Sequence, residues 1–340
     1  MTTSKYRSRA SAQRLIALAI SYQRDLLLAR GLGLEHLREL MLRIARPMVR
    51  QGASLAYGGH WKETEDNFTY DLLRLIAAEQ EDNSLGGPDT NLVIGRLYNH
   101  SAWPSYLEVT PRIEAQWINS CRVVRIPQEL AGIAPADVVP DTEAATRSDR
   151  VIFNSAVTLS AMRRMSMTSM LIAVPELPTP EVVPEVAARV MLGGKVNGYS
   201  GFLPGLFEEA LASLERGSPL FVLGGFGGAA EAIACALLDP PAQRREVFTV
   251  EWHRANNPAF AKLLDLSAKF GMPPGVPDAQ ELFDRLFARI DAAKANLPAM
   301  LKTGLNDAET RELLQTRDMR RAVQLVRQGL DSVGLVPLLL

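Results

Sequence analysis

The stretch RVMLGGKVNGYSGFLPGLFEEALASLERGSPLFVLGGFGGAAE, residues 189–231, decides which fold we expect. Apolar runs at 190–192 and 220–223 each end in a Gly-Gly pair, as buried strands that lead into tight loops do. Between them, residues 204–216 place apolar side chains at helical spacing. Strand, loop, helix and strand in this order predict a parallel βαβ unit.

Both glycine loops of this unit then lie at the carboxyl ends of neighbouring strands. In open α/β sheets ligands bind at that edge, because helix N-termini and free backbone N–H groups converge there. Glycine lets the backbone approach a phosphate without an intervening Cβ atom, so the loops predict a phosphate or ribose site. The alternative is that the glycines only close tight turns between strand and helix. The glycines concerned are Gly193, Gly194, Gly224, Gly225, Gly227 and Gly228.

Strand and helix patterns alternate along the rest of the chain. Further strands are predicted over residues 15–20, 54–57, 91–97, 122–126 and 246–250. Further helices are predicted over residues 34–48, 66–80, 110–120, 158–170, 257–270, 278–296 and 307–330. Surface loops are predicted over residues 81–90, 99–106 and 127–150. The fold class is therefore α/β, a Rossmann-like, doubly wound parallel sheet of about six or seven strands with a helical C-terminal extension.

Composition and charge exclude several classes of partner. The net charge is -1 and no long basic run occurs, so we expect no nucleic-acid partner. The two cysteines, Cys121 and Cys235, and the four histidines show no metal-ligand spacing, so we expect neither a metal nor a disulfide framework. The chain has no signal-peptide pattern and no apolar run of about 18 residues, which predicts a cytoplasmic protein without a membrane partner.

Several motifs taken together resemble those of the SLOG superfamily, a Rossmann-like nucleotide-binding group that includes the lonely-guy phosphoribohydrolases and DprA-like proteins. The closest likeness is to SLOG proteins of bacterial defence and signalling systems, including the sensor half of the Thoeris antiphage effector. The tail from Lys302 to Leu330 is also similar. The matching motifs are Met162-Arg163, RVMLGGK (189–195), GYSGFLPGLFEEA (198–210) and GSPLFVLGGFGGAA (217–230).

The resemblance implies a polar N-terminal tail (1–13), a SLOG-like Rossmannoid nucleotide-binding domain (14–252) and a helical C-terminal extension (253–340). It further implies a binding module, a sensor for a nucleotide-derived small molecule of the ADP-ribose or cyclic ADP-ribose type. Such a module acts with a separate effector protein, forms a homo-oligomer and carries no cofactor. The alternative is a phosphoribohydrolase-like N-glycosidase that cleaves a nucleotide-derived substrate, and a third possibility is a purely structural or assembly protein.

The enzyme alternative needs a catalytic carboxylate, and two places compete for it. By letters, LGGFGGAAE at 223–231 matches the phosphoribohydrolase PGGxGTxxE loop, which makes Glu231 the acid. By order along the chain, the helix after Gly193-Gly194 takes that position, which makes Glu208 or Glu209 the acid. We prefer the second match, because topology constrains geometry more than a glycine string does. Met165 stands where the phosphoribohydrolase helix has an arginine.

The expected ligand contacts follow from what a nucleotide requires. A phosphate needs donors, and Lys195, Arg163 and Arg189 are cations near the predicted sheet edge. A ribose needs acceptors for its hydroxyls, a role for Glu208 or Glu209. Residues 57–61 are candidates to contact a base. The predicted ligand-binding residues are Ser21, Gly58, Gly59, Arg163, Arg189, Gly193, Gly194, Lys195, Gly201, Gly224, Gly225, Gly227 and Gly228.

Overall fold

A six-stranded sheet forms the centre of the protein in a computed structural model, which describes residues 14–85, 94–174 and 179–336. The strands lie in the order β4-β3-β2-β1-β7-β8, and every neighbouring pair is parallel. The strands are β1 (Leu15–Ser21), β2 (Ser54–Tyr57), β3 (Leu97–Ala102), β4 (Cys121–Ile126), β7 (Val186–Gly193) and β8 (Leu220–Leu223). The predicted polar tail, 1–13, lies outside the described residues.

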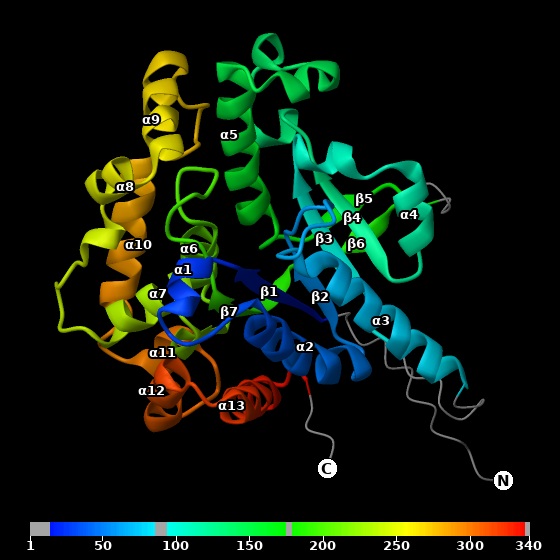
Figure 1. The fold of residues 1–340 in the computed structure, drawn as a ribbon, viewed down its shortest axis with the longest axis vertical. Helices are drawn as coiled ribbons and strands as arrows, with labels where there is room; N and C mark the ends of the chain where they lie inside the picture. The colour runs from blue at the N-terminus through cyan, green and yellow to red at the C-terminus, as the bar shows by residue number, and fades with distance from the viewer. Residues whose placement is uncertain (1–13, 86–93, 175–178, 337–340) are drawn as a thin grey trace.

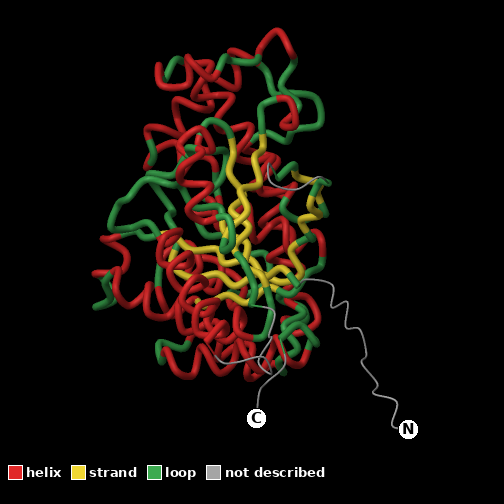
Figure 2. The backbone as a smooth tube through the Cα atoms, turned by 90° about the vertical axis from the view of Figure 1, so that its right-hand side faces the viewer, coloured by secondary structure: helices red, strands yellow, loops and turns green. Residues whose placement is uncertain are grey.

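Helices cover both faces of this sheet, and the strands run through the middle of the molecule between them (Figures 1 and 2). The helices that follow the strands in the first two-thirds of the chain are α1 (Arg24–Leu28), α2 (Leu34–Arg50), α3 (Phe68–Leu85), α4 (Pro111–Trp117), α5 (Asp149–Met165), α6 (Gly205–Arg216) and α7 (Gly228–Leu238). The arrangement is a Rossmann-like, doubly wound α/β fold, as the sequence predicts.

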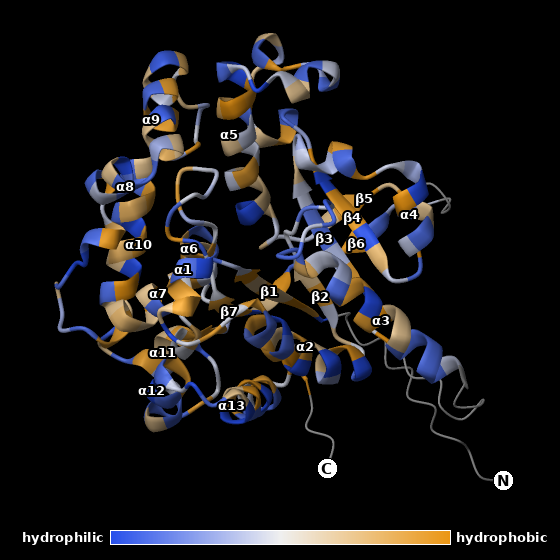
Figure 3. Ribbon diagram, in the orientation of Figure 1, coloured by the Kyte–Doolittle hydropathy of each residue, from blue (hydrophilic) through white to orange (hydrophobic). Residues whose placement is uncertain are grey.

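Alternating side chains of the strands feed two separate hydrophobic cores. On β1, Leu15, Ala17 and Ala19 belong to the core under α5, α6 and α7. Ile16, Leu18 and Ile20 belong to the core under α2 and α3. β1 is apolar along most of its length, whereas helices such as α2 and α3 carry polar stripes on the outside (Figure 3). A strand buried on both faces is the expected position for a continuous apolar run.

The helices of the C-terminal extension complete both cores. They are α8 (Val250–Asn256), α9 (Pro258–Phe270), α10 (Ala279–Ala293), α11 (Leu297–Leu301), α12 (Asp307–Gln315) and α13 (Met319–Ser332). Side chains of α9 and α10 join the core on one face, whereas those of α13 join the core on the other. The extension therefore packs against the sheet of its own chain.

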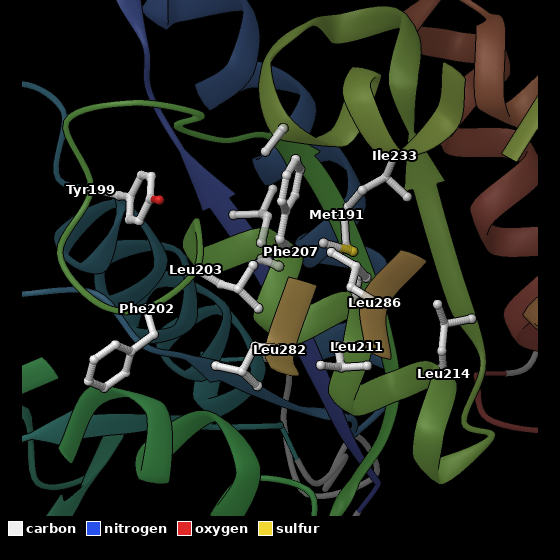
Figure 4. Close-up of a cluster of buried hydrophobic side chains, with 14 of the residues drawn as sticks. Met191, Tyr199, Phe202, Leu203, Phe207, Leu211, Leu214, Ile233, Leu282 and Leu286 are labelled. Carbon is white, nitrogen blue, oxygen red and sulfur yellow. The ribbon is translucent and has the colours of Figure 1, made fainter. Parts of the chain in front are cut away.

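The central βαβ unit of β7, α6 and β8 is present as predicted. β7 and β8 pair in parallel with Arg189 opposite Leu220, and α6 crosses between them. Phe207 and Leu211 of α6 lie beside Leu282 and Leu286 of α10 in a cluster of buried apolar side chains (Figure 4). This apolar face gives α6 the helical period that the sequence displays.

Two elements in the first half of the chain differ from the prediction. Residues 91–93 of the predicted strand 91–97 lie outside the described residues, and β3 instead runs from Leu97 to Ala102. The predicted strand was placed too early because β3 itself contains polar residues and does not look like a buried strand. One of them, Asn99, is buried and accepts a hydrogen bond from the Trp61 indole at 2.9 Å. The predicted helix 158–170 begins earlier, at Asp149, where the Ser148 hydroxyl caps it, and ends at Met165.

Three further differences lie around and after the central unit. The predicted strand 246–250 is wrong, because residues 246–248 form a 3-10 turn and α8 starts at Val250. The predicted helix 307–330 is two helices, and Asp318 caps the second by accepting from the backbone N–H groups of Arg320 and Arg321. A small antiparallel hairpin of β5 (Met170–Ile172) and β6 (Glu181–Val183) was not predicted.

Gly225 tests how tightly the extension is seated on the sheet. A Cβ atom at Gly225 would lie 2.0 Å from the carbonyl oxygen of Thr316, just beyond α12. We expect Gly225→Ala to lower the free energy of unfolding by about 1–3 kcal/mol, since backbone must move to relieve the overlap. Gly33→Ala is the matched control: its nearest neighbour would be 3.9 Å away, and we expect a loss below about 1 kcal/mol. Urea denaturation measures both, and equal losses would contradict this account.

Candidate functional site

The strand order creates a switch point next to β1. β2, β3 and β4 lie on one side of β1, whereas β7 and β8 lie on the other. The chain therefore leaves β1 and β7 toward opposite faces of the sheet. Crevices at the carboxyl ends of such strands are the usual ligand sites of open α/β sheets.

A cleft of about 230 Å³ occupies this position. It is formed by the ends of β1 and β2, the loop after β7, one side of α5 and the first turns of α6. Its polar and charged lining comes from Ser21, Tyr22, Tyr57, His60, Asp66, Ser105, Arg163, Lys195 and Glu209.

One side of the cleft carries positive charge. Gly205 and Leu206, the first two residues of α6, line it, and no side chain caps this helix. The N–H groups of an uncapped first turn and the helix dipole attract anions. Lys195 lines the same cleft and forms no ion pair with any described residue.

The loop after β7 holds Lys195 in place. Gly193 and Gly194 have φ angles of 64° and 99°, in the left-handed region that favours glycine. The Gly194 N–H donates to the Ser21 carbonyl oxygen at 2.7 Å, and the Lys195 N–H donates to the Ser21 hydroxyl at 3.1 Å. The end of β1 therefore fixes the direction in which Lys195 leaves the sheet.

Two ion pairs support the cleft. Arg163 of α5 donates to Glu208 at 2.6 Å, and Glu208 also accepts a hydrogen bond from Ser160. Arg189 of β7 donates to Glu209 at 2.5 Å. Burial lowers the pKa of the Arg189 guanidinium, and the neighbouring Glu209 carboxylate opposes this shift. The two pairs join α5 and β7 to consecutive residues of α6.

The two glutamates differ in access to the cleft. Glu208 is only 2% exposed and lies behind the lining, against α5. Glu209 lines the cleft while paired with Arg189. Arg163 is 8% exposed, lines the cleft, and has an Nε atom without a hydrogen-bond partner among the described residues.

The structure brings together many of the residues predicted for the site. Ser21, Gly58, Gly59, Arg163, Lys195 and Glu209 all line the cleft. Arg189 lines a small cavity directly below, together with Glu209 and Arg163. Gly193 and Gly194 shape the loop that carries Lys195, and Gly201 lines a neighbouring cavity.

The second glycine loop lies outside the cleft. Gly224 and Gly225 pack against the backbone at the end of α12, where a Cβ atom would collide with carbonyl oxygens. A Cβ atom on Gly228 would lie 2.4 Å from the Gly194 carbonyl oxygen, which also accepts from the Ala229 N–H at 3.0 Å. Gly227 lies against α1. The first glycine loop therefore covers the N-terminus of α7.

The remaining glutamate, Glu231, also lies outside the cleft lining. It forms an ion pair with Arg30, just beyond α1. The comparison with the phosphoribohydrolases by order of elements therefore selects a helix whose Glu209 lines the cleft. The comparison by sequence motif selects Glu231, which forms this ion pair outside the cleft.

Sequence reasoning named no site role for Asp66 or Tyr22, which also line the cleft, whereas His60, another lining residue, lies within the segment 57–61 that was expected to contact a base. A hydrogen bond from the Thr64 hydroxyl lowers the pKa of Asp66, and the charge of Lys195 contributes to the shift. The signal available was the position of Asp66 shortly after Gly58 and Gly59. Trp61, by contrast, was considered for base contact but is buried and donates to Asn99.

Within residues 14–85, 94–174 and 179–336, no group of three His, Cys, Asp or Glu side chains is arranged to hold a metal ion. In the same residues, no helix combines the length and the apolar character needed to cross a bilayer.

The protein therefore has a Rossmann-like α/β fold, with a cleft at the switch point where small molecules bind in folds of this kind. A family model described as SLOG cluster2 matches residues 10–313, so the chain belongs to the SLOG cluster2 family. Membership associates the protein with binding or processing of nucleotide-related molecules. A search of curated proteins finds no match to the chain.

The Arg163–Glu208 pair provides a stability test. Removing one partner of a buried ion pair leaves an uncompensated charge, so Glu208→Ala should lower the free energy of unfolding by about 3–5 kcal/mol. Glu231→Ala is the matched control, because it breaks a partly exposed Arg–Glu pair and should lose about 0–1 kcal/mol. Chemical denaturation compares the two. Equal losses would mean that the Arg163–Glu208 pair has no special structural role.

His100, which lines the small cavity below the cleft, should make stability depend on pH. Burial, aided by the charge of Arg189, lowers its pKa from 6.5 to about 4. The folded state therefore keeps His100 neutral while the unfolded state takes up a proton, so stability falls as the pH falls from 6.5 to about 4. The loss reaches about 3 kcal/mol at most.

The free energy of unfolding measured across this pH range checks the expectation. The fall should be shallower in His100→Gln, whereas His36→Gln, which changes an exposed histidine, should keep the wild-type slope. A wild-type slope in His100→Gln would show that other groups cause the pH dependence.

Proposed function

We propose that this protein is a binding module, a sensor for a nucleotide-derived small molecule of the ADP-ribose or cyclic ADP-ribose type. One observation carries the proposal: an unpaired lysine and an uncapped helix N-terminus share a cleft with carboxylates. Lys195 and the start of α6 supply donors for a phosphate. Asp66 and Glu209 supply acceptors for ribose hydroxyls.

The charge arrangement favours binding over turnover. Glu209 pairs with Arg189 and Glu208 pairs with Arg163, so both helix glutamates already have a cation as partner. A general acid or base must be free to exchange a proton with the reacting group. Paired carboxylates are better suited to hold hydroxyl groups in place than to transfer protons.

The resemblance to sensor proteins of bacterial defence and signalling systems supports a role in signalling to another protein. In this proposal ligand binding is passed to a separate effector protein, in the cytoplasm, by a homo-oligomer of the chain. The ligand is the signal and leaves unchanged.

N-glycosidic cleavage is the second candidate function. It is favoured by the fact that two carboxylates, Asp66 and Glu209, line the same cleft. Carboxylates can stabilise an oxocarbenium-like sugar or activate water in such reactions. In that case the cleft releases a free base from its nucleotide.

Incubation with AMP, NAD, ADP-ribose and cyclic ADP-ribose separates the two functions. Thermal shift reports binding, and chromatography reports release of the base. A rise in melting temperature without base release is the result expected for the sensor. Base release would establish the enzyme, and a complete lack of binding would refute both.

Lys195→Ala tests the phosphate contact directly. A charge-assisted hydrogen bond contributes roughly 1.5–3 kcal/mol, so the affinity for ADP-ribose should fall about tenfold to a hundredfold. Lys262→Ala is the matched control, because Lys262 pairs with Asp149 on the surface and lines neither cavity beside the site. Calorimetric titration measures both variants. Unchanged affinity in Lys195→Ala would remove this lysine from the site.

A further inference from the structure

A second cavity, which we call the chamber, lies beside the cleft and has a volume of about 670 Å³. It is open on one side and is lined by the segment after β3, by residues 144–147 before α5, by α5 and α9, and by the loop before α6. α5 and α9 pack against each other and stand side by side in Figure 1.

The cleft and the chamber adjoin. Ala102 at the end of β3, Ser105 just beyond it and Leu159 of α5 line both cavities. A group that projects from a ligand in the cleft past Leu159 consequently enters the chamber. Gly201, predicted as a ligand contact, lines the chamber and not the cleft.

The lining of the chamber differs chemically from that of the cleft. Aliphatic and aromatic side chains dominate it, among them Leu107, Leu263 and Phe260. Its hydroxyl groups come from Ser105, Ser155, Tyr199 and Ser200.

The charges of the chamber are few. Lys62 and Glu108 neutralise each other at 3.0 Å, and the third charged residue, Arg147, is exposed. Apolar walls with a few hydroxyl groups suit an uncharged, flat group that has polar edges, such as a nucleobase with its ribose.

The volumes of the cleft and the chamber also suggest that each holds a different part of one ligand. Pockets that enclose whole small molecules span about 300–1,000 Å³, so the cleft alone is small and the chamber is well within the range. We infer that the chamber is the second compartment of the ligand site. It selects dinucleotide-type ligands, in which two ribosyl units are joined by a pyrophosphate, over a ribose phosphate alone.

This inference rests on the proposed function and assigns the parts of the ligand. One ribose and its phosphate occupy the cleft, next to Lys195 and the start of α6. The second nucleoside occupies the chamber, against α5 and α9. Selection then comes from apolar burial of the nucleoside, because the chamber offers no second cluster of cations among the described residues.

Ser155→Trp tests the assignment by filling the chamber. Ser155 lies on α5, lines the chamber but not the cleft, and its side chain makes no hydrogen bond to the described residues. Ser84→Trp on the exposed end of α3 is the matched control. The probes are ADP-ribose and ribose 5-phosphate, which is contained within it, and calorimetry measures their affinities.

Wild-type protein and Ser84→Trp should bind ADP-ribose at least about tenfold more tightly than ribose 5-phosphate. Ser155→Trp should lose about tenfold or more in affinity for ADP-ribose and keep its affinity for ribose 5-phosphate within about twofold. If circular dichroism shows that Ser155→Trp does not fold, Ser155→Leu, with a smaller side chain, is measured in its place.

Two results would overturn the inference while leaving the proposed function intact. One is equal affinity of the wild-type protein for the two probes, and the other is unchanged ADP-ribose affinity in the filled variant. Failure of the wild-type protein to bind either probe, or AMP, would overturn the proposed function and the inference together.

Discussion

The buried ion pair between Arg163 and Glu208 is the interaction on which the site depends. It ties α5 to the first turn of α6 in a region where a lone charge could not remain. The next residue of α6, Glu209, pairs with Arg189 of β7. Two consecutive glutamates of α6 therefore fix the positions of α5 and β7 next to the cleft. One of them, Glu209, also lines the cleft.

The two glycine loops illustrate how similar letters serve different purposes. At 193–195 the glycines turn the chain so that Lys195 leaves the end of β7 toward the cleft. At 224–228 three of the glycines admit the backbone at the end of α12 and of the first loop, and none of the four lines the cleft. The helix after the first loop starts at the cleft, whereas the start of the helix after the second is covered by the Gly194 carbonyl oxygen.

The cleft and the chamber together describe a site with a polar end and an apolar end. The polar end combines donors and acceptors of the kinds that phosphate and ribose require. The apolar end is built by α5 and α9, so the C-terminal extension contributes to the candidate site as well as to both cores. A single ligand that spans both ends would be bound by charged and polar contacts in the cleft and by apolar packing in the chamber.

The sequence by itself determined the α/β class, the βαβ unit, the SLOG resemblance and a minority of the residues that meet at the cleft, because burial periods and loop glycines are local signals. It misplaced β3, whose polar side chains are satisfied by partners distant in the chain, such as Trp61. Only the tertiary structure decided that Glu208 is buried and Glu209 lines the cleft. Their spacing on a helix is known from the sequence, but the arginines that pair with them come from a different helix and a strand. The chamber could likewise not be predicted from the sequence, since a cavity exists only where elements distant in the chain meet.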